Sequence, residues 1–405
     1  MQPIKKITYL NYVNSIQDGA STHVTEFVRN FSELCDAQGI SFNVVSPTLK
    51  QGGHEHGNRL FSQLKFALSR YYVRDLKIMA QQVKEYYLER KLLIAQKPDL
   101  VIVRYNGRNL SILHACKSLN IPCVLEVNAS DTEKPDGDYK RIPFFQRRLQ
   151  NHSAINLVSG AFTVSKAIKE EIVNRCQSDA ARKAMSAKIS VIPNGANTSH
   201  FDGETTTSIK KELGIARSVT TIGYIGGFSP WHEVERLVDA VNKLVLDKQD
   251  VFLLLVGSDN KHSQDVKQYV KKLNLEKHVL FTGYVSYQEA PKFVGAMDIA
   301  VLPNTAYYCS PLKLFEYMSM KKAIVCVSTS PVQDIIEHEV DGLLFEQGDY
   351  GKMEEYLDFL VKNSSERIRL GAKSHEKVTT KYTWKDNSKR VMALVKRTVS
   401  NESDA

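Results

Sequence analysis

This sequence of 405 residues has no paired cysteines, no clustered histidines and no long apolar run. Its six cysteines are scattered without a Cys-x-x-Cys pair, and no histidines cluster at metal-ligand spacing. This distribution argues against structural zinc and favours a reducing compartment. No apolar run reaches membrane-spanning length, and the N-terminus lacks the layout of a signal peptide. We therefore expect a cytoplasmic protein without a structural metal site.

Two further signatures are missing. Without a Gly-x-Gly-x-x-Gly fingerprint, a nicotinamide cofactor has little support. The chain also lacks a zinc finger, an aromatic RNA-binding signature or any other nucleic-acid module, although its formal net charge is +9. A basic chain attracts phosphates in nucleotides, nucleic acid or anionic lipid. We expect no nucleic-acid partner, which leaves nucleotides and anionic membrane surfaces.

The basic residues are partly clustered with aromatic ones. Lys and Arg are interleaved with Phe and Tyr between Arg59 and Lys97, and a shorter cluster runs from Lys140 to Arg148. Such segments suit a membrane surface, but they equally suit the solvated face of an amphipathic helix. Both interpretations stay open, and with them a peripheral position at the inner face of a membrane.

Short apolar runs alternate with helical patterns along the chain. Such runs are typical of buried parallel strands in βαβ units. They lie at 7–10, 42–45, 100–103, 123–127, 160–164 and 189–192, and again at 221–225, 251–256, 279–282, 299–302 and 323–327. Between the two series stands a break at Pro193 to Asn197, followed by a polar, turn-rich segment to about residue 207.

The sequence therefore predicts an α/β protein with two doubly wound, Rossmann-like parallel-sheet domains. We expect the first domain over 1–197, the second over 198–382, and a C-terminal helix over 383–405 that packs back on the first domain. Ligands of such sheets bind at the carboxyl ends of the strands. A central cleft between the domains is thus the expected active site.

The segment from Cys309 to Met318 carries the strongest chemical signal. It reads as a helix start after a buried strand, with Ser310 as the N-cap and Pro311 in the first helical position. The N–H groups of Leu312 and Lys313 would then have no acceptor inside the helix. A cation in this first turn opposes the helix dipole unless an anion binds there.

One turn later, Glu316 could accept two hydroxyl groups. Phosphate donors followed by a diol acceptor are the arrangement expected for a nucleoside diphosphate and its ribose. An ordinary solvated pair of Lys313 and Glu316, three residues apart, is the alternative.

Glycine loops follow the first strand of each domain. Gly19 permits close approach of the backbone to a ligand, and His23, near the next helix start, could reach the cleft. Gly226 and Gly227 offer the same access in the second domain, where His232 precedes a helix and could face a phosphate. The alternatives are a capping turn with a surface histidine and a tight turn with a stacked Trp–His pair. The turns at Gly257 and Gly283 could read a base edge or simply end their strands.

Several motifs accompany the helix start in a fixed order. They are Val191-Ile192-Pro193-Asn194-Gly195, Ile222-Gly223-Tyr224-Ile225-Gly226, Leu254-Leu255-Val256-Gly257, Phe281-Thr282-Gly283-Tyr284-Val285 and Asp341-Gly342-Leu343-Leu344-Phe345. Together with residues 310–318 they resemble glycosyltransferase family 4 over nearly the whole chain. The resemblance implies a GT-B fold, a nucleotide-sugar donor and a retaining transfer without a metal or other cofactor.

The resemblance also implies residue roles. Glu316 would accept the ribose hydroxyls, and the N–H groups of Leu312 and Lys313 would hold the diphosphate. Catalysis would involve Lys313, His232 and His23, and the last would lie toward the acceptor or the donor sugar. The donor-binding set is Gly19, Gly226, Gly227, Gly257, Gly283, Tyr284, Val285, Tyr308, Ser310, Pro311, Leu312, Lys313 and Glu316.

The sequence departs from the family pattern in three places. Tyr308 stands where a second glutamate is frequent, and Gly227 and His232 stand where Arg and Lys are frequent. The usual first-domain histidine is replaced by the segment 126–131. Its acceptor-side candidates, besides His23, are Glu126, Asn128 and Asp131.

The implied function is transfer of a hexosyl group from a nucleotide-diphosphate sugar, UDP rather than GDP, to a glycan or lipid-linked acceptor. The Ser310–Glu316 form resembles a branch involved in surface polysaccharide assembly. Same-face attack is favoured because no first-domain carboxylate stands out as a nucleophile. Two alternatives stay open: a GT-B sugar-nucleotide epimerase using Glu126 and Asp131 as acid and base, and a non-catalytic nucleotide-sugar-binding partner, since Tyr308 replaces a glutamate.

Overall fold

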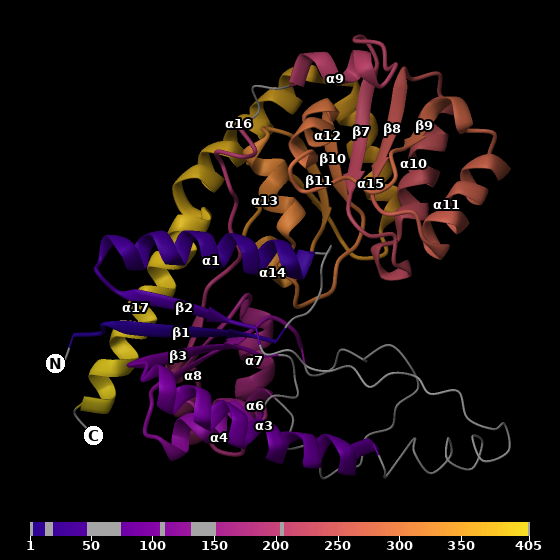
Figure 1. The fold of residues 1–405 in the computed structure, drawn as a ribbon. Helices are drawn as coiled ribbons and strands as arrows, with labels where there is room; N and C mark the ends of the chain where they lie inside the picture. Colours follow the sequence, from indigo (N-terminus) through magenta and orange to yellow (C-terminus); the bar gives the residue numbers. More distant parts are fainter. Residues whose placement is uncertain are drawn as a thin grey trace, which may run out of the picture. The chain divides into compact units, whose positions relative to one another are not determined.

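The computed structural model describes residues 3–12, 19–46, 74–105, 110–130, 151–202 and 206–403. The chain divides into two compact units, one of residues 1–192 with 388–405 and one of residues 193–387. Each unit contains a six-stranded sheet whose paired strands are all parallel, with helices packed around it (Figure 1). The predicted α/β class with two doubly wound parallel sheets is confirmed.

The first sheet has the strand order β2-β1-β3-β4-β5-β6. Its strands are β1 (Lys6–Asn11), β2 (Ser41–Val45), β3 (Leu100–Arg104), β4 (Cys123–Val127), β5 (Gly160–Thr163) and β6 (Ile189–Val191). The order reverses at β1, because β2 pairs on one side of it and β3 on the other. The carboxyl ends of β1 and β3, where Asn11 pairs with Arg104, therefore form the topological switch point at which ligands bind.

Helices of the first unit connect these strands. They are α1 (Gly19–Ala37), α3 (Arg74–Gln96), α4 (Leu110–Ser118), α6 (Asn151–Ile155), α7 (Lys166–Asn174) and α8 (Asp179–Lys188). The last helix of the chain, α17 (Trp384–Ser403), also contributes to this unit from residue 388 onward. Its Val391 and Val395 are fully buried, and a Cβ at Gly160 would lie only 2.7 Å from the Thr398 hydroxyl.

The second sheet has the order β12-β11-β10-β7-β8-β9. Its strands are β7 (Thr220–Ile225), β8 (Val251–Val256), β9 (Val279–Phe281), β10 (Ile299–Leu302), β11 (Ala323–Val327) and β12 (Leu343–Phe345). The order reverses between β7 and β10. The loops after these two strands are therefore where a ligand of this unit is expected.

The second unit has more helices than the sequence pattern indicated. They are α9 (Thr206–Glu212), α10 (Val234–Leu246), α11 (Lys261–Lys272), α12 (Ala290–Ala296), α13 (Leu312–Ser319), α14 (Ser330–Gln333), α15 (Tyr350–Lys362) and α16 (Ser364–Lys381), with a 3-10 turn, η2, at Pro230–His232. The polar stretch after residue 198 was expected to be irregular, but α9 begins within it. Its inward-facing Ile209 is buried, and seven residues are too few to show a clear period.

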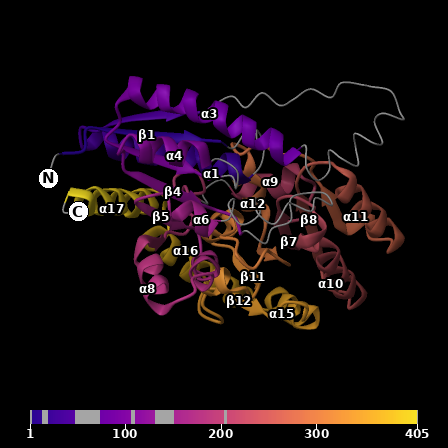
Figure 2. The same ribbon diagram turned by 90° about the horizontal axis from the view of Figure 1, so that it is seen from below.

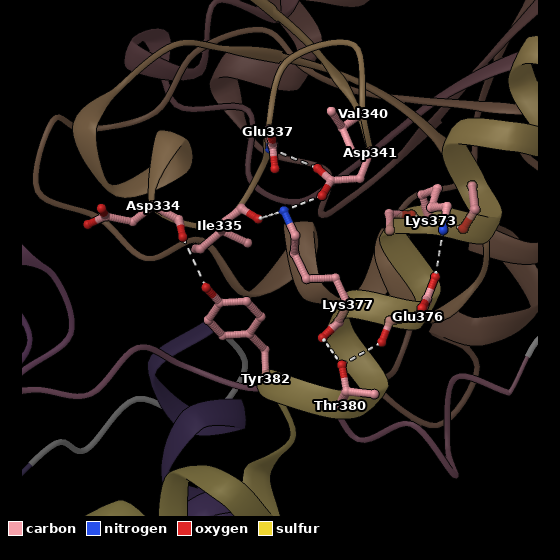
Figure 3. Close-up of polar contacts among 12 residues, drawn as sticks. Asp334, Ile335, Glu337, Val340, Asp341, Lys373, Glu376, Lys377, Thr380 and Tyr382 are labelled. Carbon is pink, nitrogen blue, oxygen red and sulfur yellow. Dashed lines mark hydrogen bonds and ion pairs between the residues drawn. The ribbon is translucent and has the colours of Figure 1, made fainter.

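The Asp341-Gly342 motif has a structural role. Asp341 is buried, accepts the Glu337 N–H at 2.8 Å and forms an ion pair with Lys377 of α16 (Figure 3). The Lys377 amine also donates to the Ile335 carbonyl at 3.1 Å. These contacts fix the turn between α14 and β12 against α16, away from the carboxyl ends of β7 and β10.

Candidate functional site

The helix α13 begins one residue later than predicted. Pro311 is its N-cap residue with extended backbone angles, and no side chain caps the helix. Ser310 is buried and makes other bonds: its hydroxyl accepts the Asn194 N–H at 3.3 Å, and its carbonyl accepts the Asn194 side-chain amide at 2.7 Å. The expectation of Ser310 as the N-cap is therefore wrong, because Asn194 occupies its hydroxyl and fixes the approach to the helix.

The first turn of α13 leaves backbone donors available. The N–H of Leu314 donates to the Pro311 carbonyl at 3.1 Å. The N–H groups of Leu312 and Lys313 precede this bond, so they have no acceptor inside the helix. Together with the positive end of the helix dipole, they can bind an anion placed before the helix.

The Lys313 amine lies in a fitted position at this helix start. It donates to the Tyr224 hydroxyl at 3.0 Å and lies 4.4 Å from the centre of the Tyr224 ring. A Cβ at Gly226, whose φ is +143°, would lie 2.4 Å from the same amine. Gly226 therefore makes room for the lysine, rather than bringing its own backbone to a ligand as the sequence suggested. The Tyr224 hydroxyl in turn donates to the Gly227 carbonyl at 2.6 Å.

Burial lowers the pKa of Lys313 to about 8, although Cys309 and Glu316 act in the opposite direction. The amine is therefore mostly charged at neutral pH. Within the described part of the chain, Lys313 forms no ion pair. Its positive charge is thus available to an external anion.

His232 lies close to this lysine but is not a second cation. It is buried at the end of η2, stacks on Trp231 at 3.6 Å between ring centres, and its Nδ1 lies 3.4 Å from the Asn304 carbonyl. Burial, and then the charge of Lys313, lower the pKa of His232 to about 3. The imidazole is therefore neutral near pH 7. It can only donate or accept a hydrogen bond.

The glycine turns after β7, β8 and β9 pack on one another. The Gly226 N–H donates to the Val256 carbonyl at 2.9 Å, and the Gly257 N–H donates to the Gly283 carbonyl at 3.2 Å. A Cβ at Gly257 would lie 2.1 Å from the Gly226 carbonyl oxygen. These two N–H groups are therefore not available to read a base. By contrast, a Cβ at Gly227 or Gly283 would meet no atom within 4 Å.

The remaining donor-side candidates lie on α13 and in the loops after β9 and β10. Glu316 is half-buried on α13, one turn after Lys313, and Tyr308 is buried with its ring edge-on to Tyr307. After β9, Tyr284 is 51% exposed, whereas Val285 packs against the apolar core. The structure thus brings Gly226, Lys313 and His232 together and places Tyr284 two strands further along the sheet.

Sequence analysis missed Tyr224, Asn194 and Asn304. The available signal was a tyrosine at the end of an otherwise apolar strand, since the Tyr224 hydroxyl must find a partner when buried. Asn304 is the second residue after β10, and its side-chain oxygen accepts the Thr305 N–H at 2.9 Å and the Gln347 amide at 3.2 Å.

The first unit has a buried charged cluster at its own switch point. Glu126, at the end of β4, is fully buried and forms an ion pair with Arg104. It also accepts the Tyr9 hydroxyl at 2.8 Å and the Asn128 amide at 2.6 Å, and it lies 2.7 Å from Nε2 of His23. Three of the acceptor-side candidates therefore meet. Asp131 and the Lys140 to Arg148 cluster lie outside the described residues.

This cluster changes the roles of His23 and Glu126. Burial alone would raise the pKa of Glu126, but Arg104 and His23 hold it well below its usual range. A fully buried, ionised carboxylate with four partners is not available as a general acid, base or nucleophile. His23 is buried, so a surface histidine in a capping turn is excluded. The helix α1 begins at Gly19, which places His23 in its second turn rather than in a loop.

The described residues contain neither a metal-site cluster nor a membrane-crossing helix. Across the described ranges, no three His, Cys, Asp or Glu side chains group as a metal site. Among the described helices, none is long and apolar enough to cross a membrane.

Two family models match complementary parts of the chain. The model described as Glycosyltransferase Family 4 matches residues 17–200, and the model described as Glycosyl transferases group 1 matches residues 205–377. The first range includes Arg104 and Glu126 but not β1, and the second includes the loops after β7 and β10.

Individual relatives are more distant. The chain is 28% identical over 172 residues to the N-acetyl-alpha-D-glucosaminyl L-malate synthase of Bacillus anthracis, a match that covers 42% of this chain and 44% of that protein. It is 23% identical over 305 residues to the lipopolysaccharide 1,2-N-acetylglucosaminetransferase of Salmonella typhimurium, covering 73% and 72%. The structure of Anabaena Alr3699/HepE in complex with UDP and glucose aligns with a TM-score of 0.67 at 15% identity, covering 97% of this chain and 100% of that one.

Proposed function

Because the chain belongs to glycosyltransferase family 4 and has its GT-B fold, we propose that it moves a hexosyl group from a UDP-sugar to a glycan or lipid-linked acceptor in cell-surface polysaccharide or glycolipid synthesis. We further propose that the transfer retains the anomeric configuration and requires no metal or other cofactor. The observation that carries this proposal is the Lys313 amine at the N-terminus of α13, which is mostly charged at neutral pH, donates to the Tyr224 hydroxyl and forms no ion pair with any described residue.

The chemistry to be catalysed is departure of UDP from the anomeric carbon. Negative charge develops on the leaving phosphate, and fixed donors that face it lower the barrier. Lys313 and the N–H groups of Leu312 and Lys313 supply one cation and two oriented donors at a single helix end. We assign them the diphosphate, which is the role that a metal ion would otherwise have.

Glu316 is assigned the ribose, because it lies one turn beyond the diphosphate donors on the same helix. Gly227 and Gly283 leave open space after β7 and β9, where a sugar or base can approach the backbone. Neutral His232 is assigned a hydrogen bond to the donor rather than a charge.

A retaining reaction needs either a covalent intermediate or attack on the same face. At the first switch point, Glu126 is buried with four partners, so we assign it no role as a nucleophile. The same occupancy leaves the epimerase hypothesis without one of its two proposed carboxylates. Both facts favour same-face transfer, with His23 rather than Glu126 directed to the substrate.

The choice of UDP is supported by the neighbouring structure that contains UDP. Two relatives are named for transfer of N-acetylglucosaminyl groups. UDP-N-acetylglucosamine and UDP-glucose are therefore the first donors to test.

The decisive experiment incubates the pure protein with labelled UDP- and GDP-sugars and follows the products. Slow release of free sugar and UDP from one UDP-sugar, abolished in Lys313→Ala, is the expected result. Interconversion of sugars would instead indicate an epimerase. Binding without turnover, even with glycan acceptors added, would indicate a non-catalytic partner. Undiminished turnover after EDTA treatment is expected, and loss that Mg²⁺ restores would contradict the metal-independent part.

A further inference from the structure

The helix α3 is inverted with respect to the usual amphipathic pattern. Between positions 79 and 96 its only acidic residues, Glu85 and Glu89, are buried, while large apolar side chains face outward. Val83 is 57%, Tyr87 68% and Leu88 60% exposed. Of the thirteen large apolar side chains that are exposed in the described part of the chain, five belong to this one helix, so the exposure is concentrated rather than scattered.

The rotation of α3 about its axis is fixed by specific hydrogen bonds. The Tyr12 hydroxyl donates to Glu89 at 2.5 Å, and the Gln82 side chain accepts the Ser111 N–H of α4 at 3.0 Å. At the far end, the Lys6 amine donates to the Gln96 carbonyl at 2.6 Å. The outward apolar face is therefore a defined feature of this helix, which runs along the first unit in Figure 2.

Four of the five exposed apolar residues lie on one side of the helix, with Arg90 between Tyr87 and Ile94. Met79, Val83, Tyr87 and Ile94 follow one another at spacings of four, four and seven residues, which places them on one side of a helix. We call these four residues the α3 stripe. At 1.5 Å per residue the helix is about 35 Å long, so the stripe is an extended, linear surface.

Positive charge borders the α3 stripe. Lys84 and Lys91, seven residues apart and both exposed, run along one edge of it, and Arg90 is half-buried beside it. Between positions 79 and 96 no acidic side chain is exposed. The surface therefore presents apolar side chains, one of them a tyrosine, next to lysines whose charge no exposed acidic side chain of this segment offsets.

From this combination we propose that α3 docks lengthwise on an anionic phospholipid membrane. The apolar side chains of the stripe would enter the boundary between headgroups and acyl chains, while Lys84 and Lys91 would contact lipid phosphates. A long helix that presents apolar residues beside lysines fits a planar, fluid, anionic surface. Nucleic acid would leave the stripe's aliphatic residues, Met79, Val83 and Ile94, without a complementary surface.

The test is sedimentation with vesicles of phosphatidylcholine alone or with about 30% phosphatidylglycerol, which makes the vesicle surface anionic. Full-length protein is expected to bind the anionic vesicles and to dissociate as salt increases. Lys84→Gln and Lys91→Gln should each lower the partition constant about fivefold. Val83→Glu with Tyr87→Glu should abolish binding.

Matched controls use exposed positions elsewhere. Lys271→Gln with Lys272→Gln on α11 removes the same charge, and Ile368→Glu on α16 introduces an acid at a residue 72% exposed. Both should bind vesicles as the unaltered chain does. Donor hydrolysis should be unchanged in every α3 variant, because no residue of the stripe belongs to the donor site.

Three results would overturn the proposal: no binding by the unaltered chain, equal losses in the controls, or full binding after Val83→Glu with Tyr87→Glu. A dimer that dissociates in that double variant, measured by light scattering without any vesicle binding, would show that a second copy covers the stripe, and would also overturn it.

Discussion

At the residue scale, the proposed site depends on one amine that forms no ion pair with the residues that the structure describes. Lys313 lies against Tyr224 in the space that a side chain at position 226 would fill. Burial makes this ammonium costly, which is why its pKa is lowered to about 8. A bound diphosphate would repay that cost, because a nearby anion favours the charged form.

This reasoning predicts a proton uptake on UDP binding. The free amine has a pKa of about 8 and the bound phosphates raise it, so affinity should be flat below pH 8 and fall above it. Calorimetry in buffers of different ionisation enthalpy should show uptake near pH 9. Lys313→Arg should bind without uptake, and Lys313→Ala should bind about 2 kcal/mol more weakly at pH 7. Uptake that persists in Lys313→Ala would assign the proton to another group.

A second prediction concerns the ribose. Glu316→Gln should weaken UDP binding by about 2 kcal/mol, because a charged acceptor of two hydroxyls becomes a neutral one. The same substitution should leave the affinity for 2′,3′-dideoxy-UDP nearly unchanged. If both ligands lose equally, Glu316 acts on something other than the ribose.

At the element scale, the start of α13 is positioned by a loop more than a hundred residues away. The Asn194 side chain donates to the buried Ser310 carbonyl at 2.7 Å, and its N–H donates to the Ser310 hydroxyl. This arrangement explains why Ser310 does not cap the helix. It also connects the Pro193-Asn194-Gly195 motif to the donor site, a function that the local sequence does not reveal.

Asn194→Ala should therefore lower both stability and donor affinity. It leaves the Ser310 carbonyl buried without its donor, which costs about 1–3 kcal/mol of unfolding free energy. The matched control is Lys322→Met, which removes a buried donor to the Gly295 carbonyl at the opposite, amino edge of the sheet. Both variants should melt lower by fluorescence, but only Asn194→Ala should weaken UDP binding. Equal UDP affinities would separate Asn194 from the site.

At the scale of the whole molecule, the chain passes between its two units near residues 193 and 387. The helix α17 belongs to the first unit from residue 388 onward, and its buried Val395 comes from the far end of the sequence. The residues proposed for the diphosphate and the ribose, Lys313 and Glu316, belong to the second unit, whereas His23 and Glu126 belong to the first. Each unit has its own apolar core. A ligand or a substitution in one unit can therefore change the stability of that unit alone.

Differential scanning calorimetry should therefore resolve two transitions with separate responses. UDP at a hundred times its Kd should stabilise the second unit by about 2.7 kcal/mol and leave the first unchanged. Val395→Ala should lower only the transition of the first unit, by about 2 kcal/mol for the lost methyl groups. A single transition that shifts with both changes would show that the units unfold together.

Much of the fold follows from local pattern. The apolar runs predicted β4 and β8 at their observed bounds, and the helix over Val234–Leu246 is α10. These predictions succeed because burial of a parallel strand imposes a continuous apolar run, which is readable in sequence. The boundary at Ser310 was predicted wrongly, because the deciding hydrogen bonds come from Asn194, elsewhere in the chain.

The sequence by itself determined the class of protein, the succession of apolar runs along the chain and a cation at the start of α13, since each is written in consecutive residues. Only the tertiary structure decided that Gly226 makes room for that cation, that His232 is neutral, and that Glu126 is occupied by Arg104 and His23. It alone also decided that α3 turns its glutamates inward. These outcomes depend on contacts between residues 22 to 117 positions apart, and no local period encodes them.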